Sequence, residues 1–297
     1  MLDRLCTSVD TTRLGAKLAD DMSLGFNPLF DLDVSVPLGW SRQPSFGRRA
    51  DIATGTTADI WPGAALVRPL PLAPVTMTVV STSAADNVGT ALGAQIAACS
   101  FIDDAGDWRV SDLLLLNGVT PVTVTYKPDQ KLASAGAEPS FADATSIAAP
   151  IFRLLDAQVL VAAGATAIAP LVTNQGTLNF ASGGVIYEVI PIGTGRSRSC
   201  CFHCPRGFTG ALTRVHTGSA RGAAEIFLAA TFGLGTSFQR VPLAALNSTT
   251  IVFYNDASTT PIAERADVQL AATAGTNNVD VFGILQIRLM PNLLAVS

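Results

Sequence analysis

The stretch VTMTVVSTS (residues 75–83) decides the expected fold, because its side chains alternate with a period of two residues. Val75, Met77 and Val79 fall on one face of an extended chain, and threonines stand between them. β-Branched runs of similar length recur after residue 65, in VTVTY, AQVLVAA, GVIYEVIPI, LTRVHT, TTIVFYND and ADVQLAAT. Helical crossover patterns are missing between these runs, so the sequence favours antiparallel sheets over an alternating α/β sheet.

Turn-forming residues separate the runs. Asn117 and Gly118 form a pair suited to the positive φ angles of a hairpin turn, and DDAGD (103–107) and TNNVD (276–280) supply Asx-turn formers and glycine. The glycine pairs SGG and GTG flank one strong strand within residues 181–195. This spacing of short strands and turns is typical of antiparallel β-sandwiches.

We therefore predict an all-β protein with two antiparallel β-sandwich (jelly-roll-like) domains, over residues 65–185 and 186–297. An N-terminal region, residues 1–64, precedes them. It combines a short amphipathic helix within residues 1–26 with an extended arm, residues 27–64, that is dense in proline, glycine and isolated large apolar residues. Such an arm is stable only when it lies over another surface.

The large apolar side chains of this arm are the candidate assembly anchors: Leu29, Phe30, Trp40, Phe46 and Trp61. Because the arm has little periodic structure of its own, we expect its partner to lie outside its own fold. Deletion of residues 1–64 is accordingly expected to leave a folded β core.

The composition indicates association. Only 14% of the residues are charged and 48% are hydrophobic, which is a low charge content for a freely soluble monomer. We expect copies of the chain to cover one another in a symmetric homo-oligomer. A net charge of −4, with basic clusters no longer than GRR (47–49) and RSRS (196–199), predicts no nucleic-acid partner.

Targeting and redox signals are equally sparse. The N-terminus has acidic residues where a signal peptide needs a basic start, so we expect synthesis in a cytoplasm. No run of 18 apolar residues is free of polar interruptions, so no membrane partner is predicted. Five cysteines, an odd number, do not predict structural disulfides in a reducing compartment.

A cysteine cluster, SCCFHC (199–204), is the one motif that could carry chemistry. On a strand, one face carries Cys201 and His203, and the other carries Cys200, Phe202 and Cys204. A straight strand cannot bring all these ligands together around zinc, and no second cysteine pair exists elsewhere. A Cys/His pair adjacent in sequence also points in opposite directions, which disfavours a nucleophile and its base. We interpret the segment as a buried strand.

No other pattern predicts catalysis or a cofactor. GxSxG and glycine-rich phosphate-binding motifs are absent. The DDAGD turn lacks the pattern of a calcium loop and is interpreted as three solvated carboxylates. Nothing in the sequence pairs the acidic residues that are candidates in principle for glycoside cleavage, namely Asp51, Asp59, Glu188, Glu225 and Glu264. We therefore predict no catalytic, metal or cofactor site, and no enzyme.

Several phrases, in their order and spacing, resemble a group of tailed-bacteriophage virion structural proteins. They are NPLF (27–30), PSFGRRADIATGTTADIWPG (44–63), VTMTVVSTSAADNVGTALGAQI (75–96), DLLLLNGVTPVTV (112–124), TNQGTLNF (173–180) and ADVQLAATAGTNNVDVFG (266–283). The chain departs from the group's pattern at GTALGA, at DIWPG and at the cysteine cluster, which makes the cysteines look incidental.

The resemblance implies a part of a tailed-phage virion, synthesised in the host cytoplasm: a neck, tail or fibre-associated protein. Its partners would be copies of itself and other virion proteins of the tail, the portal-proximal region or the capsid. Two alternatives remain open, a head decoration protein and a receptor- or carbohydrate-binding module of a tail appendage that contacts a host surface glycan.

Overall fold

The computed structural model describes residues 41–89, 93–128, 145–161, 174–231, 239–246, 251–254, 260–275 and 278–292. These residues contain strands and turns but no helix, and every ladder between the named strands is antiparallel. The all-β, antiparallel prediction is confirmed, whereas its jelly-roll-like detail stays a prediction. None of these residues belongs to a helix long and apolar enough to cross a membrane. The helix predicted within residues 1–26 lies outside the described residues.

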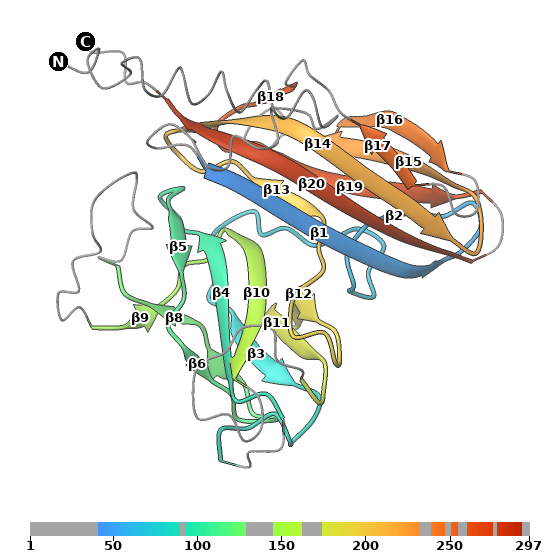
Figure 1. Ribbon diagram of the computed structural model, residues 1–297. Coiled ribbons are helices and arrows are strands. Elements are labelled where there is room, and N and C mark those ends of the chain that lie inside the picture. Colours follow the sequence, from blue (N-terminus) through green and yellow to red (C-terminus); the bar gives the residue numbers. More distant parts are fainter. Residues whose placement is uncertain are drawn as a thin grey trace, which may run out of the picture.

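The strands form two bodies, one above the other in Figure 1. The upper body, here called the long-strand module, contains the described residues within 41–60 and 199–292. Its first sheet has the order β1 (Ser41–Ile52), β20 (Val279–Pro291), β14 (Phe208–Ala220) and β17 (Ile251–Tyr254), with β18 (Thr260–Ile262) also on β14. Its second sheet has the order β13 (Cys201–His203), β19 (Asp267–Ala274), β15 (Ala224–Ala230) and β16 (Gln239–Leu246), with β2 (Thr57–Asp59) also on β19.

Side-chain alternation explains how these two sheets share a core. Along β20, Val281, Leu285 and Ile287 are fully buried at a spacing of two or four residues. They belong to the same apolar cluster as Leu270 of β19 and Ile226 of β15 in the other sheet. Burial of each such side chain stabilises the fold by about 1.5–3 kcal/mol.

The lower body, the short-strand module, contains the described residues within 75–195 and also has antiparallel sheets. One has the order β12 (Val185–Ile190), β11 (Leu178–Ser182), β3 (Thr78–Ser81) and β7 (Val122–Thr123). Another has the order β10 (Arg153–Val161), β4 (Ile96–Ile102) and β5 (Trp108–Val110), with β6 (Leu114–Leu115) also on β4, and a small pair joins β8 (Thr125–Tyr126) to β9 (Ile147–Ala148). Their shared core includes Met77 and Val79 of the alternating stretch, with Phe101 and Phe180 from β4 and β11.

The structure divides the chain differently from the predicted boundaries. β12 pairs with β11, so residues 185–190 belong to the first module and not to the predicted domain 186–297. Residues 41–59, predicted as part of the arm, form β1 and β2 inside the second module. Deletion of residues 1–64 would therefore remove two core strands, and the expectation that it leaves a folded core is wrong.

The NG turn also differs from its expected setting. Gly118 has a φ of 58°, as predicted for the turn, and Asn117 accepts a hydrogen bond from the backbone N–H of Thr120. The turn, however, connects β6 in one sheet to β7 in another, since β6 pairs with β4 and β7 with β3. By contrast, the DDAGD turn joins β4 directly to its neighbour β5, as a hairpin.

Glycine allows β1 to approach the segment that enters β13. Gly47 of β1 lies opposite Gly283 of β20. A Cβ atom at Gly47 would lie only 2.4 Å from the backbone nitrogen of Cys200 and 2.6 Å from the carbonyl oxygen of Ile60. Cys200 therefore packs into a hollow that exists because both positions lack side chains.

We predict that Gly47→Ala destabilises the protein by about 1–3 kcal/mol, because the new methyl group would meet rigid backbone atoms. Urea unfolding followed by circular dichroism measures this change. Gly275→Ala is the matched control, since a Cβ there would meet nothing closer than 3.4 Å. Equal urea midpoints for Gly47→Ala and Gly275→Ala would contradict this prediction, because they would show that the residues around Cys200 move enough to accept the methyl group.

Candidate functional site

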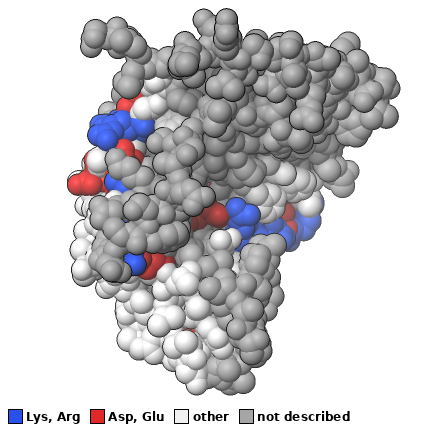
Figure 2. Space-filling model, turned by 60° about the vertical axis from the view of Figure 1, so that its left-hand side comes forward, with Lys and Arg blue, Asp and Glu red and all other residues white. Residues whose placement is uncertain are grey.

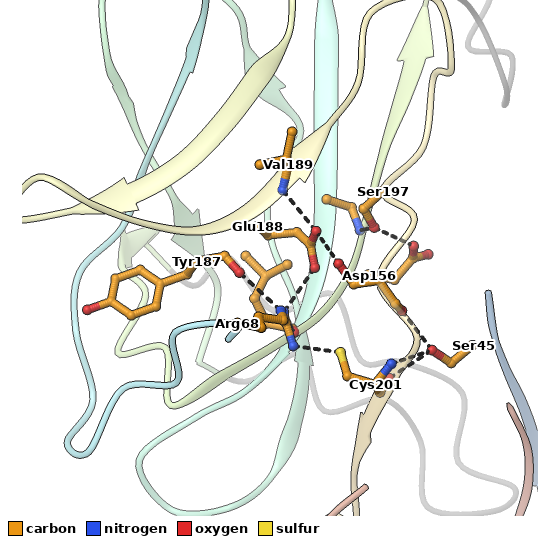
Figure 3. Close-up of polar contacts among 11 residues, drawn as sticks. Ser45, Arg68, Asp156, Tyr187, Glu188, Val189, Ser197 and Cys201 are labelled. Atoms are coloured by element: carbon orange, nitrogen blue, oxygen red, sulfur yellow. Dashed lines mark hydrogen bonds and ion pairs between the residues drawn. The ribbon is translucent and has the colours of Figure 1, made fainter. Parts of the chain in front are cut away.

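The two modules meet at a buried polar junction. In Figure 2, blue and red atoms lie on the left side and along the underside of the upper body, and few of the described atoms of the lower body are coloured. Arg68, on the segment between β2 and β3, is 5% exposed and lies at the centre of this junction (Figure 3). An isolated arginine in the apolar run RPLPLAPV is the only sequence signal for its role.

The Arg68 guanidinium connects strands of both modules. In the short-strand module, Nη2 donates to Glu188 Oε2 at 2.9 Å and to the carbonyl of Leu154 at 2.8 Å, and Nε donates to the carbonyl of Tyr187 at 3.2 Å. In the long-strand module, Nη1 donates to Cys201 Sγ. One side chain thus fixes β10, β12 and β13 relative to each other.

Glu188 balances the charge of Arg68 at a fully buried position. Its Oε1 accepts hydrogen bonds from the Ser199 hydroxyl at 2.6 Å and from the backbone N–H of Val189 at 2.8 Å. Burial raises the pKa of Glu188, and the neighbouring Arg68 opposes this rise. The carboxylate therefore depends on Arg68 to remain charged.

A second ion pair crosses the junction between β10 and β19. Arg153 Nε and Nη2 donate to the two carboxylate oxygens of Asp267, both at 2.9 Å. The same guanidinium donates through Nη1 to the carbonyls of Pro71 and Phe152 and lies 4.0 Å from the centre of the Phe152 ring. This bidentate geometry holds the two modules in one orientation.

His203 and Thr231 complete the surroundings of Asp267. His203 Nδ1 lies 2.8 Å from Asp267 Oδ1, and the Asp267 backbone N–H donates to the Thr231 hydroxyl. Burial alone would raise the pKa of Asp267, but the hydrogen bonds with His203 and Arg153 hold that pKa below its ordinary value. The carboxylate is therefore charged at neutral pH.

The cysteine cluster is a buried strand, as predicted. Cys200, Phe202 and Cys204 face the core of the long-strand module. Cys201 and His203 point to the other side, but the short-strand module covers that side, so they are buried as well. The sequence pattern indicated that these side chains alternate between two faces of a strand. It could not show that the short-strand module covers the face with Cys201 and His203.

The thiols of this cluster have no acid–base activity near neutral pH. Burial raises the pKa of Cys201 and of Cys204 to about 12 and raises that of Cys200 well above its ordinary value. Nucleophilic attack and metal binding both require the thiolate. No group of three or more metal-ligating side chains occurs in the described part of the chain.

The DDAGD turn differs from its interpretation as three solvated carboxylates. Asp103 is buried and accepts hydrogen bonds from Arg109 Nε at 2.7 Å and from the backbone N–H of Asp107 at 2.8 Å. Asp107 also pairs with Arg206 of the long-strand module. A cleft of about 230 Å³, lined in part by Asp104 and His203, lies beside this turn.

The predicted anchors have different environments. Leu29, Phe30 and Trp40 lie outside the described residues. Phe46 is 42% exposed on β1, whereas Trp61 is 2% exposed and donates from Nε1 to the carbonyl of Ala65. Trp61 therefore fills the interior of its own chain and is not available to a partner.

The structure does not assemble the acidic candidates into a catalytic pair. Asp59 accepts the backbone N–H of Arg68, and Glu188 accepts its guanidinium. Asp51 pairs with Arg221, and Glu264 accepts from Asn292. Their contacts are those of structural ion pairs and hydrogen bonds, and Glu225 lies on β15.

Comparison with known proteins gives little. No protein-family profile and no curated protein sequence matches this chain. Among solved structures, it is similar to the infectious bursal disease virus Gx strain structure, at 9% identity over 86% of this chain and 82% of that one, with a TM-score of 0.15. The infectious bursal disease virus VP2 subviral particle matches at 8% identity over 85% and 72%, with a TM-score of 0.17. At these TM-scores, the likeness carries no argument about this chain.

Asp267→Asn is predicted to destabilise the protein by about 3–5 kcal/mol, because it leaves the buried Arg153 without a countercharge. Chemical denaturation measures the loss. Arg196→Gln, which breaks the ion pair between Arg196 and Asp156, is the control: those side chains are 48% and 33% exposed, so the expected loss is below about 1 kcal/mol. Similar losses for both variants would contradict the role of the buried pair.

The pH dependence provides a second readout of the same variant. Because the pKa of Asp267 in the folded chain lies below its ordinary value of 3.8, its charge stabilises the fold fully above that value. This contribution is lost as the pH falls through the lower folded pKa. The stability gap between the native chain and Asp267→Asn is therefore expected to be constant near neutral pH and to narrow in strong acid.

The buried thiols are predicted to resist alkylation in the folded state. In a Cys6→Ser variant, we expect Cys99, Cys200, Cys201 and Cys204 to react with a maleimide at pH 8 only after unfolding in guanidinium chloride. Mass spectrometry of the folded and unfolded samples measures the labelled sites. Rapid labelling of Cys201 in the folded protein would mean that the junction opens readily.

Proposed function

We propose that this chain is a non-enzymatic structural component of a virus particle, synthesised in the host cytoplasm and built into the particle through contacts with other copies and other virion proteins. The observation that carries the proposal is the junction. Two β modules are held in one orientation by the buried ion pair between Arg153 and Asp267 and by the buried Arg68, which pairs with Glu188 in one module and donates to Cys201 in the other. A subunit that must repeat its geometry in every copy requires such a fixed angle between its parts.

The finer assignment is to a tailed-phage virion, as a neck, tail or fibre-associated protein. The ordered phrases between residues 27 and 283 support it, and two parts of the phrase at 44–63 have structural roles in this chain. The Phe-Gly pair contributes Gly47 to the hollow around Cys200. The DIWPG phrase, residues 59–63, leads from β2 into a loop, and the carbonyls of Gly63 and Ala65 in this loop accept hydrogen bonds from the buried Arg49. A head decoration protein is the alternative within the same class.

A receptor- or glycan-binding module is the second candidate class. Such a site would present several exposed aromatic side chains for stacking on sugar rings. Among the large hydrophobic residues exposed in the described part of the chain, Phe46 is the only aromatic one. Trp61 and Tyr126 are buried. Glycan binding to this chain would be tested at the cleft beside Asp104.

We expect the chain to be present in purified virus particles at a fixed copy number, after loosely bound proteins have been removed by a high-salt wash. Quantitative mass spectrometry of particles and of infected-cell lysate measures this. A second virion protein of known copy number serves as the internal standard. Recovery of the chain from lysate alone, with none in washed particles, would contradict a structural role.

A further inference from the structure

The cleft beside the turn between β4 and β5 is formed by both modules together. It has a volume of about 230 Å³, and we call it the junction cleft. The short-strand module contributes Asp104 and Phe152 to its wall, and the long-strand module contributes His203 and Arg265. Leu72, on the segment that connects β2 to β3, lines it as well and is 94% exposed. Neither module alone could form this cleft.

Contacts between the modules fix the shape of the junction cleft. The backbone N–H of Arg206 donates to the carbonyl of Gly106 at 2.7 Å, and Arg265 Nη2 donates to the carbonyl of Ala105 at 3.1 Å. Asp107, in the same turn, pairs with Arg206. These contacts hold the turn against the long-strand module. A ligand therefore finds a wall that is already formed, which lowers the entropic cost of binding.

His203 brings an unused hydrogen-bonding atom to this cleft. Its Nδ1 faces the ionised Asp267, which accepts a hydrogen bond, so Nδ1 carries the proton of the neutral ring. Nε2 is then an acceptor, and it is buried with no hydrogen-bond partner among the described residues. Asp267 does not line the cleft, so the opposite edge of the ring, with Nε2, is directed to it. A buried acceptor without a donor is rare in folded proteins, which points to an N–H or O–H group of a ligand.

The charges at the junction cleft are of both signs and balance each other. Asp104 is exposed and, among the described residues, accepts only the backbone N–H of Ala105. The guanidinium of Arg265 donates to one backbone carbonyl, which leaves N–H groups for a ligand. The charge of Asp103, which also lines the cleft, is paired with Arg109. An anion would meet Asp104 and a cation would meet Arg265, so a neutral ligand fits best.

We propose that the junction cleft binds a neutral ligand rich in hydroxyl groups, of the size of a single sugar ring. A hydroxyl both donates and accepts, so such a ligand can donate to His203 Nε2 and to Asp104 and accept from Arg265. The volume is below the range of about 300–1,000 Å³ typical of sites for drug-sized ligands. Leu72 and Phe152 offer apolar surface to the C–H groups of the ring. This inference goes beyond the proposed role in the particle and does not depend on it.

Neutral and charged sugars test the charge argument on the full-length protein. The probes are the methyl glycosides of glucose and galactose, each with its uronate and its amino-sugar analogue. We expect at least one neutral glycoside to bind at millimolar concentration, and its charged analogues to bind at least about tenfold more weakly. Isothermal titration calorimetry measures the affinities. Tighter binding of a charged analogue than of its neutral parent would overturn the ligand class.

The imidazole nitrogens report where the sugar binds. The chain has two histidines, so a His216→Asn variant assigns their nitrogen-15 NMR signals. Binding is expected to shift the Nε2 signal of His203, because this acceptor gains a donor, and to leave the signals of His216 unchanged. Binding without any change at the His203 ring would place the sugar elsewhere and contradict the proposal.

A substitution in the cleft wall provides an independent readout. Asp104→Ala removes an exposed acceptor and is expected to weaken binding by about tenfold, since hydrogen bonds to charged groups are among the stronger ones. Glu225→Ala is the matched control, because it removes an exposed carboxylate of β15 that does not line the cleft. Circular dichroism verifies that both variants are folded. Equal affinities of the Asp104→Ala variant and the native chain would count against the site.

The same ligand chemistry could come from a free sugar or from the end of a glycan chain. An oligosaccharide that ends in the preferred sugar distinguishes the two: retained binding identifies a chain end, and lost binding identifies a free sugar, both at the proposed site. If no neutral glycoside binds at millimolar concentration, the proposal is wrong. The structural role is measured separately, in washed particles, so either proposal can fail without the other.

Discussion

The constraint that shapes this molecule is the burial of two arginine side chains between two β modules. A guanidinium group removed from water costs several kcal/mol unless a countercharge and hydrogen-bond acceptors replace the solvent. Arg68 and Arg153 each find a carboxylate and backbone carbonyls, drawn from strands that are far apart in sequence. Asp267 meets Arg153, and Cys201 meets Arg68, only when both modules are folded and docked, so these contacts couple the folding of the two modules.

This arrangement fixes the relative orientation of the two modules more than it raises the free energy of unfolding. Replacement of a buried ion pair by apolar residues of similar volume often leaves stability unchanged or raises it. The bidentate contact between Arg153 and Asp267, however, has a narrow geometric optimum that an apolar contact lacks. The junction therefore limits how far one module can turn against the other, which is consistent with the role proposed above.

The sequence predicted those parts of the structure that follow from local patterns. Alternation in residues 75–83 and at Cys200, Phe202 and Cys204 placed the correct side chains in the two cores. β1 could not be recognised, because SRQPSFGRRADI lacks apolar alternation and obtains its strand from pairing with β20. The junction could not be predicted from the sequence either, because a lone arginine in an apolar run does not indicate which distant carboxylate will pair with it.

The position of β1 in the chain also has a kinetic consequence. Its residues, Ser41–Ile52, are synthesised long before their sheet partner, Val279–Pro291, because the whole short-strand module lies between them in sequence. The short-strand module, which lies between them in sequence, can complete its own ladders earlier. Pairing across such a separation is slow, because the loop must close before the contacts form. The long-strand module thus reaches its final form only after Val279–Pro291 has been synthesised, so any contact that requires this module must wait for that segment.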